Sequence, residues 1–220
     1  MGYEEFTDVP GRLDDAVHQL VKEFDGIFDP DTVEGLVRES AKQLEGSNVA
    51  SFVPILAHRF ARERLRARAQ AEGKLAKAVT EVVFVSITGG GRARIAASLL
   101  EQRTGADVSI HTAGAGAMAA IDANVRQAMF EVGVDLTDKY ARPLTHEVLG
   151  AADIVVTMGR SVGTVEIPGH ARHLDWRVGD PAGAELDEVR RVRDDILRRV
   201  EQLAEGLTAS NAFAPTVADA

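Results

Sequence analysis

The chain has 220 residues, a formal net charge of -9 and no cysteine. The absence of cysteine excludes disulfides, thiolate zinc sites, iron–sulfur clusters and cysteine nucleophiles. The acidic net charge argues against nonspecific nucleic-acid binding, because such binding needs Lys and Arg side chains at the phosphates. Hydrophobic residues make up 45% and charged residues 27%, the balance of a globular chain with a packed core, long enough for one large domain or two small ones.

The first 77 residues predict three helices. Their N-terminus is acidic and lacks the apolar segment of a signal peptide, and no stretch of the chain approaches 18 apolar residues, so we expect a cytoplasmic protein without membrane association. Gly26 is a plausible helix stop, and Asp29-Pro30 is typical of an N-cap followed by proline in the first turn. Pro54 fits only within the first turn of the third helix.

Apolar residues recur at helical spacing in all three segments, so we expect an all-α three-helix domain over residues 1–77, with a linker at 73–77. The third segment also carries five arginines. These are Arg59, Arg62, Arg64, Arg66 and Arg68. We interpret them as a solvated or ion-paired helix face, since most runs of charged residues are of this kind.

After the linker, strand and helix patterns alternate. Short β-branched runs predict strands at 81–86, 107–112, 153–157 and 170–175. Helical periodicity covers 92–104, 124–132 and the region from about 184 onward. Such alternation predicts an α/β domain over residues 78–207, a four-stranded parallel sheet flanked by helices on both faces, followed by a flexible tail at 208–220.

The loop after the first strand is the strongest candidate site. Ligands of open α/β sheets bind beyond the carboxyl ends of the strands. Consecutive glycines let backbone N–H groups turn inward as an anion nest, and the following helix adds its positive end. Arg92 supplies a guanidinium for a tetrahedral oxyanion. We therefore predict an anion cradle, against the alternative of an ordinary glycine turn, made of Ser86, Ile87, Thr88, Gly89, Gly90, Gly91 and Arg92.

Three weaker patterns compete with this loop. Gly114-x-Gly116-x-x-Ala119 superficially fits a dinucleotide fingerprint, but it does not follow the first strand. His170 and His173 are spaced for a metal site, with surface histidines as the simpler interpretation. A Ser-His-Asp arrangement at Ser86 would need His111 or His173 to reach the loop. We expect no metal and no cofactor.

The segment order from about residue 80 to 206 resembles the low-molecular-weight protein tyrosine phosphatases and the related thiol-coupled arsenate reductases. It is carried by VVFVSITGGGRARIAASLL, HTAGAG, QAMFEVGVDLTDKYARPLT, ADIVVTMG and LDWRVGDPAG. The resemblance implies a phosphatase-like fold and a general-acid role for Asp180, in the family's Asp-Pro loop. The N-terminal helices resemble a three-helix module of actinobacterial arsenate-reductase-like proteins, which implies a homodimer through residues 1–77.

The chain departs from this family at every thiol position. Ser86 stands where the family has its nucleophilic cysteine, and Arg160 and Thr164 stand where a reductase segment has two more. Gly89 stands where the family has an Asn that braces the loop, and Ala93 replaces the Ser or Thr that stabilises the thiolate. Arg160 either lines the cleft or points to solvent. A serine hydroxyl is far less acidic than a thiol and needs an adjacent base, so we expect the family's phosphoryl-enzyme mechanism to be lost or very slow. Thiol–disulfide reduction of arsenate is excluded, because the chain has no sulfur nucleophile.

Three functional hypotheses remain from the sequence. The leading one is a thiol-free relative that binds a phosphate-like oxyanion or a phosphorylated partner. The second is a hydrolase or transferase in which Ser86 or water attacks a phosphoryl or activated ester, with Arg92 and Asp180 assisting. The third is a structural or regulatory dimer with an empty loop.

Overall fold

The computed structural model describes residues 9–44, 53–86, 91–114, 121–136, 142–143, 145–159 and 165–211. By its contacts the chain divides into two units, residues 1–77 with 145–151, and residues 78–144 with 152–220. Among the described residues, no helix has the length and apolar character needed to cross a membrane.

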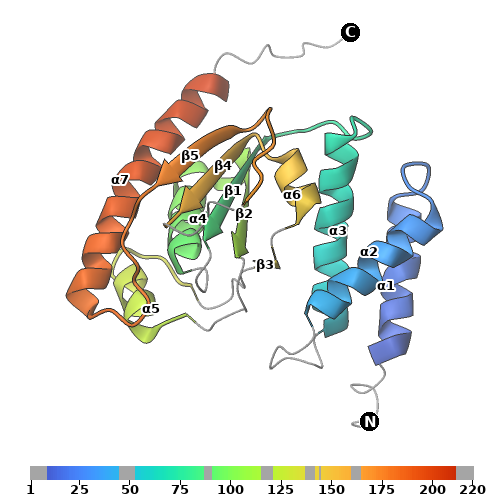
Figure 1. The fold of residues 1–220 in the computed structure, drawn as a ribbon, viewed down its shortest axis with the longest axis horizontal. Coiled ribbons are helices and arrows are strands. Elements are labelled where there is room, and N and C mark those ends of the chain that lie inside the picture. The colour runs from blue at the N-terminus through green and yellow to red at the C-terminus, as the bar shows by residue number, and fades with distance from the viewer. Residues whose placement is uncertain are drawn as a thin grey trace. The chain divides into compact units, whose positions relative to one another are not determined.

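The first unit is helical. It contains α1 (Val9–Glu23), α2 (Pro30–Gln43), α3 (Val53–Ala71) and the short α6 (His146–Ala151) (Figure 1). Asp29 caps α2 as predicted, because its Oδ1 accepts a hydrogen bond from the backbone N–H of Thr32 at 2.8 Å. Pro54 lies in the first turn of α3. The apolar stripes of the three long helices meet in one cluster that includes Leu20, Phe24, Val33, Val37 and Leu65.

One predicted surface arginine of α3 is buried. Arg64 is 3% exposed, and its Nη2 lies 2.9 Å from a carboxylate oxygen of Glu39 and 2.9 Å from one of Glu147. Its Nη1 also donates to Ser40 Oγ at 3.3 Å. Arg64 is therefore ion-paired, as one of the two alternatives predicted. It is not part of a solvated face, because it links α2, α3 and α6 inside the unit.

The second unit is built on a parallel sheet. Its strands are β1 (Thr80–Ser86), β2 (Val108–Gly114), β3 (Arg142–Pro143), β4 (Ile154–Met158) and β5 (Arg172–Trp176), in the spatial order β3-β2-β1-β4-β5 (Figure 1). Every pairing is parallel. The four longer strands confirm the predicted sheet, and the two-residue β3 extends it. The central strand β1 places Ser86 beside Gly114 of β2 and Met158 of β4.

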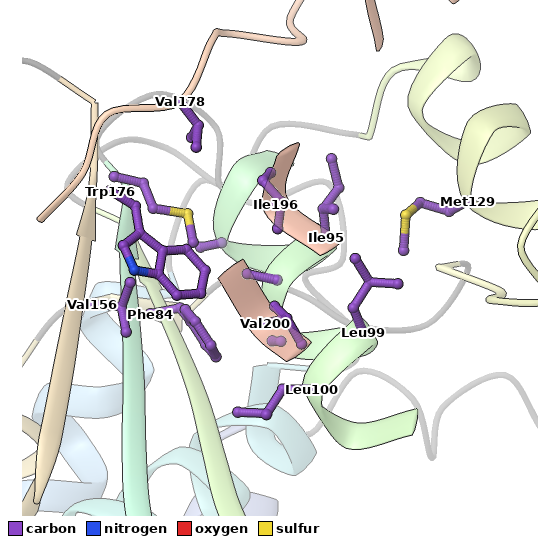
Figure 2. Packing of buried hydrophobic residues seen from close by; sticks show 14 of the residues in the cluster. Phe84, Ile95, Leu99, Leu100, Met129, Val156, Trp176, Val178, Ile196 and Val200 are labelled. Carbon is purple, nitrogen blue, oxygen red and sulfur yellow. The ribbon is translucent and has the colours of Figure 1, made fainter. Parts of the chain in front are cut away.

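Three helices cover one face of this sheet: α4 (Gly91–Thr104), α5 (Ala123–Phe130) and α7 (Leu186–Asn211), with a short 3-10 turn at Gly105–Asp107 after α4. Figure 2 shows the core between them, with Trp176 next to Phe84 and with Ile95 of α4 near Ile196 of α7. The Phe84 and Trp176 rings are tilted, with centroids 5.8 Å apart. This core fixes the strands and helices whose ends form the candidate site.

Several boundaries differ from the sequence prediction. Helix α7 begins at Leu186, and it continues to Asn211, into the segment expected to be a tail. Its small polar residues suit a helix end as well as a coil, and the Thr208 hydroxyl donates to the carbonyl of Ala204 at 3.0 Å within the helix. The short elements β3 and α6 were not predicted, because so few residues show no periodicity. Residues 212–220 lie outside the described ranges.

Candidate functional site

Ser86 is a fully buried polar residue at the end of β1. It is 0% exposed, and its Oγ has no hydrogen-bond partner among the described residues. The end of β2 approaches closely, since a Cβ at Gly114 would lie 3.3 Å from the carbonyl oxygen of Ser86. Glycine at that position therefore lets the two strand ends lie close together. A buried hydroxyl without a partner is unusual, because desolvation is normally offset by a hydrogen bond.

Arg92 is the second residue of α4 and is 8% exposed. Its guanidinium lies against Gly159, which directly follows β4. An ideal Cβ at Gly159 would stand 2.8 Å from Nη1 and 2.9 Å from both Cζ and Nη2. Gly159 has a φ of +92°, which L side chains rarely adopt, so glycine is required here both by its backbone conformation and by the arginine next to it.

Asp180 comes from the loop after β5. Its Oδ2 lies 3.4 Å from Nη2 of Arg92, and its side chain is 44% exposed. Its other oxygen, Oδ1, accepts a hydrogen bond from the backbone N–H of Ala182 at 3.2 Å. Pro181 is next to the start of α4, because a Cβ at Gly91 would lie 3.6 Å from its Cγ. The structure thus brings Arg92 and Asp180, far apart in sequence, into one place.

The loop that carries Asp180 is tied to α5. Asn124 Nδ2 donates to the carbonyl of Ala184 at 3.0 Å, and the N–H of Ala184 donates to the carbonyl of Pro181 at 3.3 Å. The side chain of Asp122 in turn caps α5 by accepting from the N–H of Asn124 at 2.8 Å. Sequence reasoning missed Asn124 and Gly159, because no local pattern marks either contact.

The remainder of the predicted cradle lies outside the described residues. This applies to Ile87, Thr88, Gly89 and Gly90, and also to Arg160, so the backbone nest and the cleft position of Arg160 stay predictions. The same holds for Gly116 and Ala119 of the dinucleotide pattern.

The histidines considered as partners for Ser86 are engaged elsewhere. His111 Nε2 lies 2.9 Å from Glu81 Oε2, and His173 Nε2 lies 2.9 Å from Thr157 Oγ1. In the sheet register, Ser86 is level with Gly114 on β2 and with Trp176 on β5. His111 and His173 each lie three residues before those positions. Because side chains alternate along a strand, both histidines point to the face of the sheet opposite Ser86. A Ser-His-Asp arrangement at Ser86 is therefore wrong for both.

The metal alternative receives no support in the described part of the chain. Within those residues, no group of three His, Cys, Asp or Glu side chains is arranged to hold a metal ion. His170 is exposed, and His173 is hydrogen-bonded as described above. The chemistry available around Arg92 is that of a guanidinium, a carboxylate, a hydroxyl and the amino end of a helix.

Two family models match the chain, one for each part. Residues 13–69 match the N-terminal domain of protein-tyrosine-phosphatase-like proteins. Residues 81–212 match the low molecular weight phosphotyrosine protein phosphatase model. The predicted resemblance is thus confirmed over both segments.

Individual relatives agree with these models. An arsenate reductase of Brevibacillus brevis is 36% identical over 87 residues, covering 39% of this chain and 65% of the relative. One of Bacillus cereus is 30% identical over 128 residues, covering 57% of this chain and 95% of the relative. The thioredoxin-dependent arsenate reductase of Corynebacterium glutamicum has a similar structure, with a TM-score of 0.79 and 30% identity, covering 90% of this chain and 97% of the other.

A more distant structure shares the fold alone. The YwlE arginine phosphatase of Geobacillus stearothermophilus has a TM-score of 0.56 at 20% identity, covering 63% of this chain and 99% of the other. Together with the parallel sheet, its flanking helices and the all-α segment that precedes them, the matches establish that this chain belongs to the low molecular weight phosphotyrosine protein phosphatase family.

Proposed function

We propose that this chain is a cysteine-free family member that binds a phosphate-like oxyanion, either free or on a phosphorylated partner, at the Ser86–Arg92 loop without thiol catalysis. The observation that carries the proposal is Arg92, whose side chain is 9% exposed and whose guanidinium lies between Gly159 and Asp180 where α4 begins. A shielded guanidinium binds an oxyanion more strongly than a solvated one, because its charge is screened less.

Ser86 supports binding better than catalysis. Among the described residues no base donates to or accepts from its Oγ, and a serine hydroxyl without a base is a poor nucleophile. The same hydroxyl is a suitable hydrogen-bond donor to an oxyanion. Replacing a thiolate by a neutral hydroxyl also removes a negative charge that would repel a dianion.

The names of the relatives suggest which anions to test. Several are arsenate reductases, and arsenate is a tetrahedral oxyanion like phosphate. Thiol–disulfide reduction of arsenate needs a sulfur nucleophile, and this chain contains no cysteine. For this chain we therefore place arsenate among the ligands, and not among substrates that it reduces with its own thiols.

Titration calorimetry with phosphate, arsenate and sulfate tests the proposal. We expect the native chain to bind at least one of them at millimolar concentration or below, and Arg92→Ala to abolish binding. Arg103→Ala is the matched control, because Arg103 lies in the last turn of the same helix and pairs with Glu201 at the surface. If the native chain binds none of the three, the loop is empty and the proposal is wrong.

Hydrolysis is the second candidate, and one observation favours it. Asp180 is close enough to Arg92 to serve as an acid opposite a bound ester, and 44% of its side chain is open to solvent. A p-nitrophenyl phosphate assay of the native chain, Ser86→Ala and Asp180→Asn separates the two functions. A rate that depends on Ser86 or Asp180 supports hydrolysis, whereas equal background rates in all three reject it for phosphate esters.

We also propose that residues 1–77 mediate a homodimer. The support on the chain itself is Ile55, a 44% exposed apolar residue on α3, together with the family match of residues 13–69. Light scattering is expected to give twice the chain mass for the full protein and one chain mass for Ile55→Glu. A full-length protein that stays monomeric at all concentrations contradicts this proposal.

A further inference from the structure

A pocket of about 240 Å³ lies between the edge strand β5 and the C-terminal half of α7. Strand β5 is the last strand of the sheet, so its outer side has no neighbouring strand among the described residues. The residues that line the pocket include neither Ser86 nor Arg92 nor Asp180, which separates it from the candidate site.

The floor of the pocket is apolar. Leu174 and Trp176 of β5 face Leu203 and Leu207 of α7, and these residues belong to or pack on the core shown in Figure 2. Trp176 is 6% exposed, so it is a mostly buried part of the pocket lining. A hydrocarbon group placed on this floor would lose its contact with water, which favours binding.

The rim of the pocket is cationic. Arg172 from the start of β5 and Arg199 from α7 both line it, and Gln202 adds an amide. Within the described residues, the Arg172 side chain has no ion pair and no hydrogen bond. Arg199 Nε is buried without a hydrogen-bond acceptor in the same part of the chain, 3.4 Å from the nearest carboxylate oxygen, that of Asp195.

The carboxylate of Asp195 is shared. Its Oδ1 lies 3.1 Å from Nη2 of Arg198 as well as 3.4 Å from Nε of Arg199. Among the described side chains, Arg198 and Arg199 thus share one carboxylate, and Arg172 has none. The two arginines on the rim, Arg172 and Arg199, therefore leave a local excess of positive charge. This excess stands out in a chain whose net charge is -9.

We propose that this pocket binds a small organic anion, whose carboxylate or phosphate is held by Arg172 and Arg199 and whose apolar body rests on Leu174 and Trp176. Two guanidinium groups that line one opening are a typical arrangement for an anionic head group. A pocket that combines apolar side chains with a few charged or polar groups is typical of small-molecule sites.

The test uses the full chain and two probes without ultraviolet absorption, hexanoate and hexyl phosphate, with inorganic phosphate as the head group alone. Trp176 is the single tryptophan of the chain, so its fluorescence reports on this pocket. We expect a saturable change with at least one hexyl probe, and which probe binds more tightly identifies the head group. If neither hexyl probe binds, the proposal is wrong.

Variants locate the binding. Measured by the fluorescence of Trp176, the double variant Arg172→Gln with Arg199→Gln is expected to bind the hexyl probe at least tenfold more weakly, while Arg92→Ala keeps the native fluorescence titration. The opposite pattern assigns the probe to the candidate oxyanion site and overturns the pocket, and an unchanged double variant does so as well. Because Arg92→Ala also serves the calorimetric test above, failure of either site is seen independently of the other.

A blocking variant gives a second test that keeps both arginines. Gly206 lines the pocket, and a Cβ added to it would meet nothing within 4 Å. The side chain of Gly206→Leu therefore begins in open space, and we expect it to fill the opening. Gly35→Leu is the matched control, because Gly35 is also a helical glycine with open space, on α2. Loss of probe binding in Gly206→Leu alone supports the pocket, whereas equal binding in both variants refutes it.

Discussion

Replacing Gly159 by alanine is expected to weaken oxyanion binding by about 10- to 100-fold without unfolding the chain. The new Cβ would stand 2.8 Å from Nη1 of Arg92 and 2.9 Å from its Cζ and Nη2. Comfortable contacts between heavy atoms are about 3.5 Å or longer, so the guanidinium has to retreat by on the order of 0.5–1 Å. The end of an arginine side chain moves more easily than backbone, so the change falls on the site.

The size of the effect follows from the bonds at stake. Hydrogen bonds to a charged group contribute about 1.5–3 kcal/mol, and about 1.4 kcal/mol corresponds to a tenfold change in affinity. A guanidinium displaced from Gly159 loses a large part of that contribution with any tetrahedral anion. Calorimetry with phosphate or arsenate measures the loss, and thermal unfolding shows whether the variant is folded.

Gly183→Ala is the matched control. Gly183 also has a positive φ, +67°, but nothing lies within 4 Å of an added Cβ. Both substitutions carry the backbone cost of about 1–2 kcal/mol for a left-handed L residue, and only Gly159→Ala also presses on the guanidinium. If folded Gly159→Ala binds anions as tightly as Gly183→Ala does, the contact between Gly159 and Arg92 does not position the site.

Three further predictions concern charges. Arg64→Met is expected to lower the free energy of unfolding in urea by about 2–4 kcal/mol, because it leaves two carboxylates without their buried partner. Arg62 is exposed, so Arg62→Ala is expected to lower it by at most about 1 kcal/mol. Equal losses in the two variants would contradict the role of burial. Hydrogen bonds from Arg190, the largest cause, and from Arg193 lower the pKa of Glu131 from 4.5 to about 2. The stabilising effect of this carboxylate is therefore complete above pH 4.5 and lost as the pH falls toward 2. Acid unfolding of Glu131→Gln is expected to lack that component, and an identical pH profile would refute it. Asp180→Asn removes a negative charge beside the site guanidinium, so phosphate affinity is expected to rise about three- to tenfold by calorimetry; a fall in affinity would show that the carboxylate holds the guanidinium in place.

The sequence predicted those parts of the fold that are encoded locally. The β-branched run that ends in Ser86 became the central strand, and the Asp29 side chain became a helix cap, because strand burial and capping depend on neighbouring residues. The spacing from Ser86 to Arg92 indicated an anion loop, and the structure places Arg92 at the start of α4 as expected. Pairing it with Asp180 came from the family resemblance.

Contacts between distant segments were beyond sequence reasoning. Nothing near Gly159 indicates that an arginine from another helix lies on it, because that contact exists only once β4 and α4 have packed. Arg64 was interpreted as part of a solvated or ion-paired face, and only the fold brings Glu147 to it and takes it out of water. The tether from Asn124 to Ala184 is another contact of this kind.

The strand order determines when the site can form during synthesis. Strand β1 leaves the ribosome early, but it lies between β2 and β4, and β4 follows it only after α4, β2 and α5. Gly159 comes directly after β4, and Asp180 later still, after β5. Until those segments emerge, one edge of β1 is unpaired, and Arg92 lacks Gly159 and Asp180 as neighbours. The anion that we propose therefore cannot promote the early steps of folding. The stabilising effect of the anion that we propose is therefore expected only at the last step, once Gly159 and Asp180 have reached Arg92.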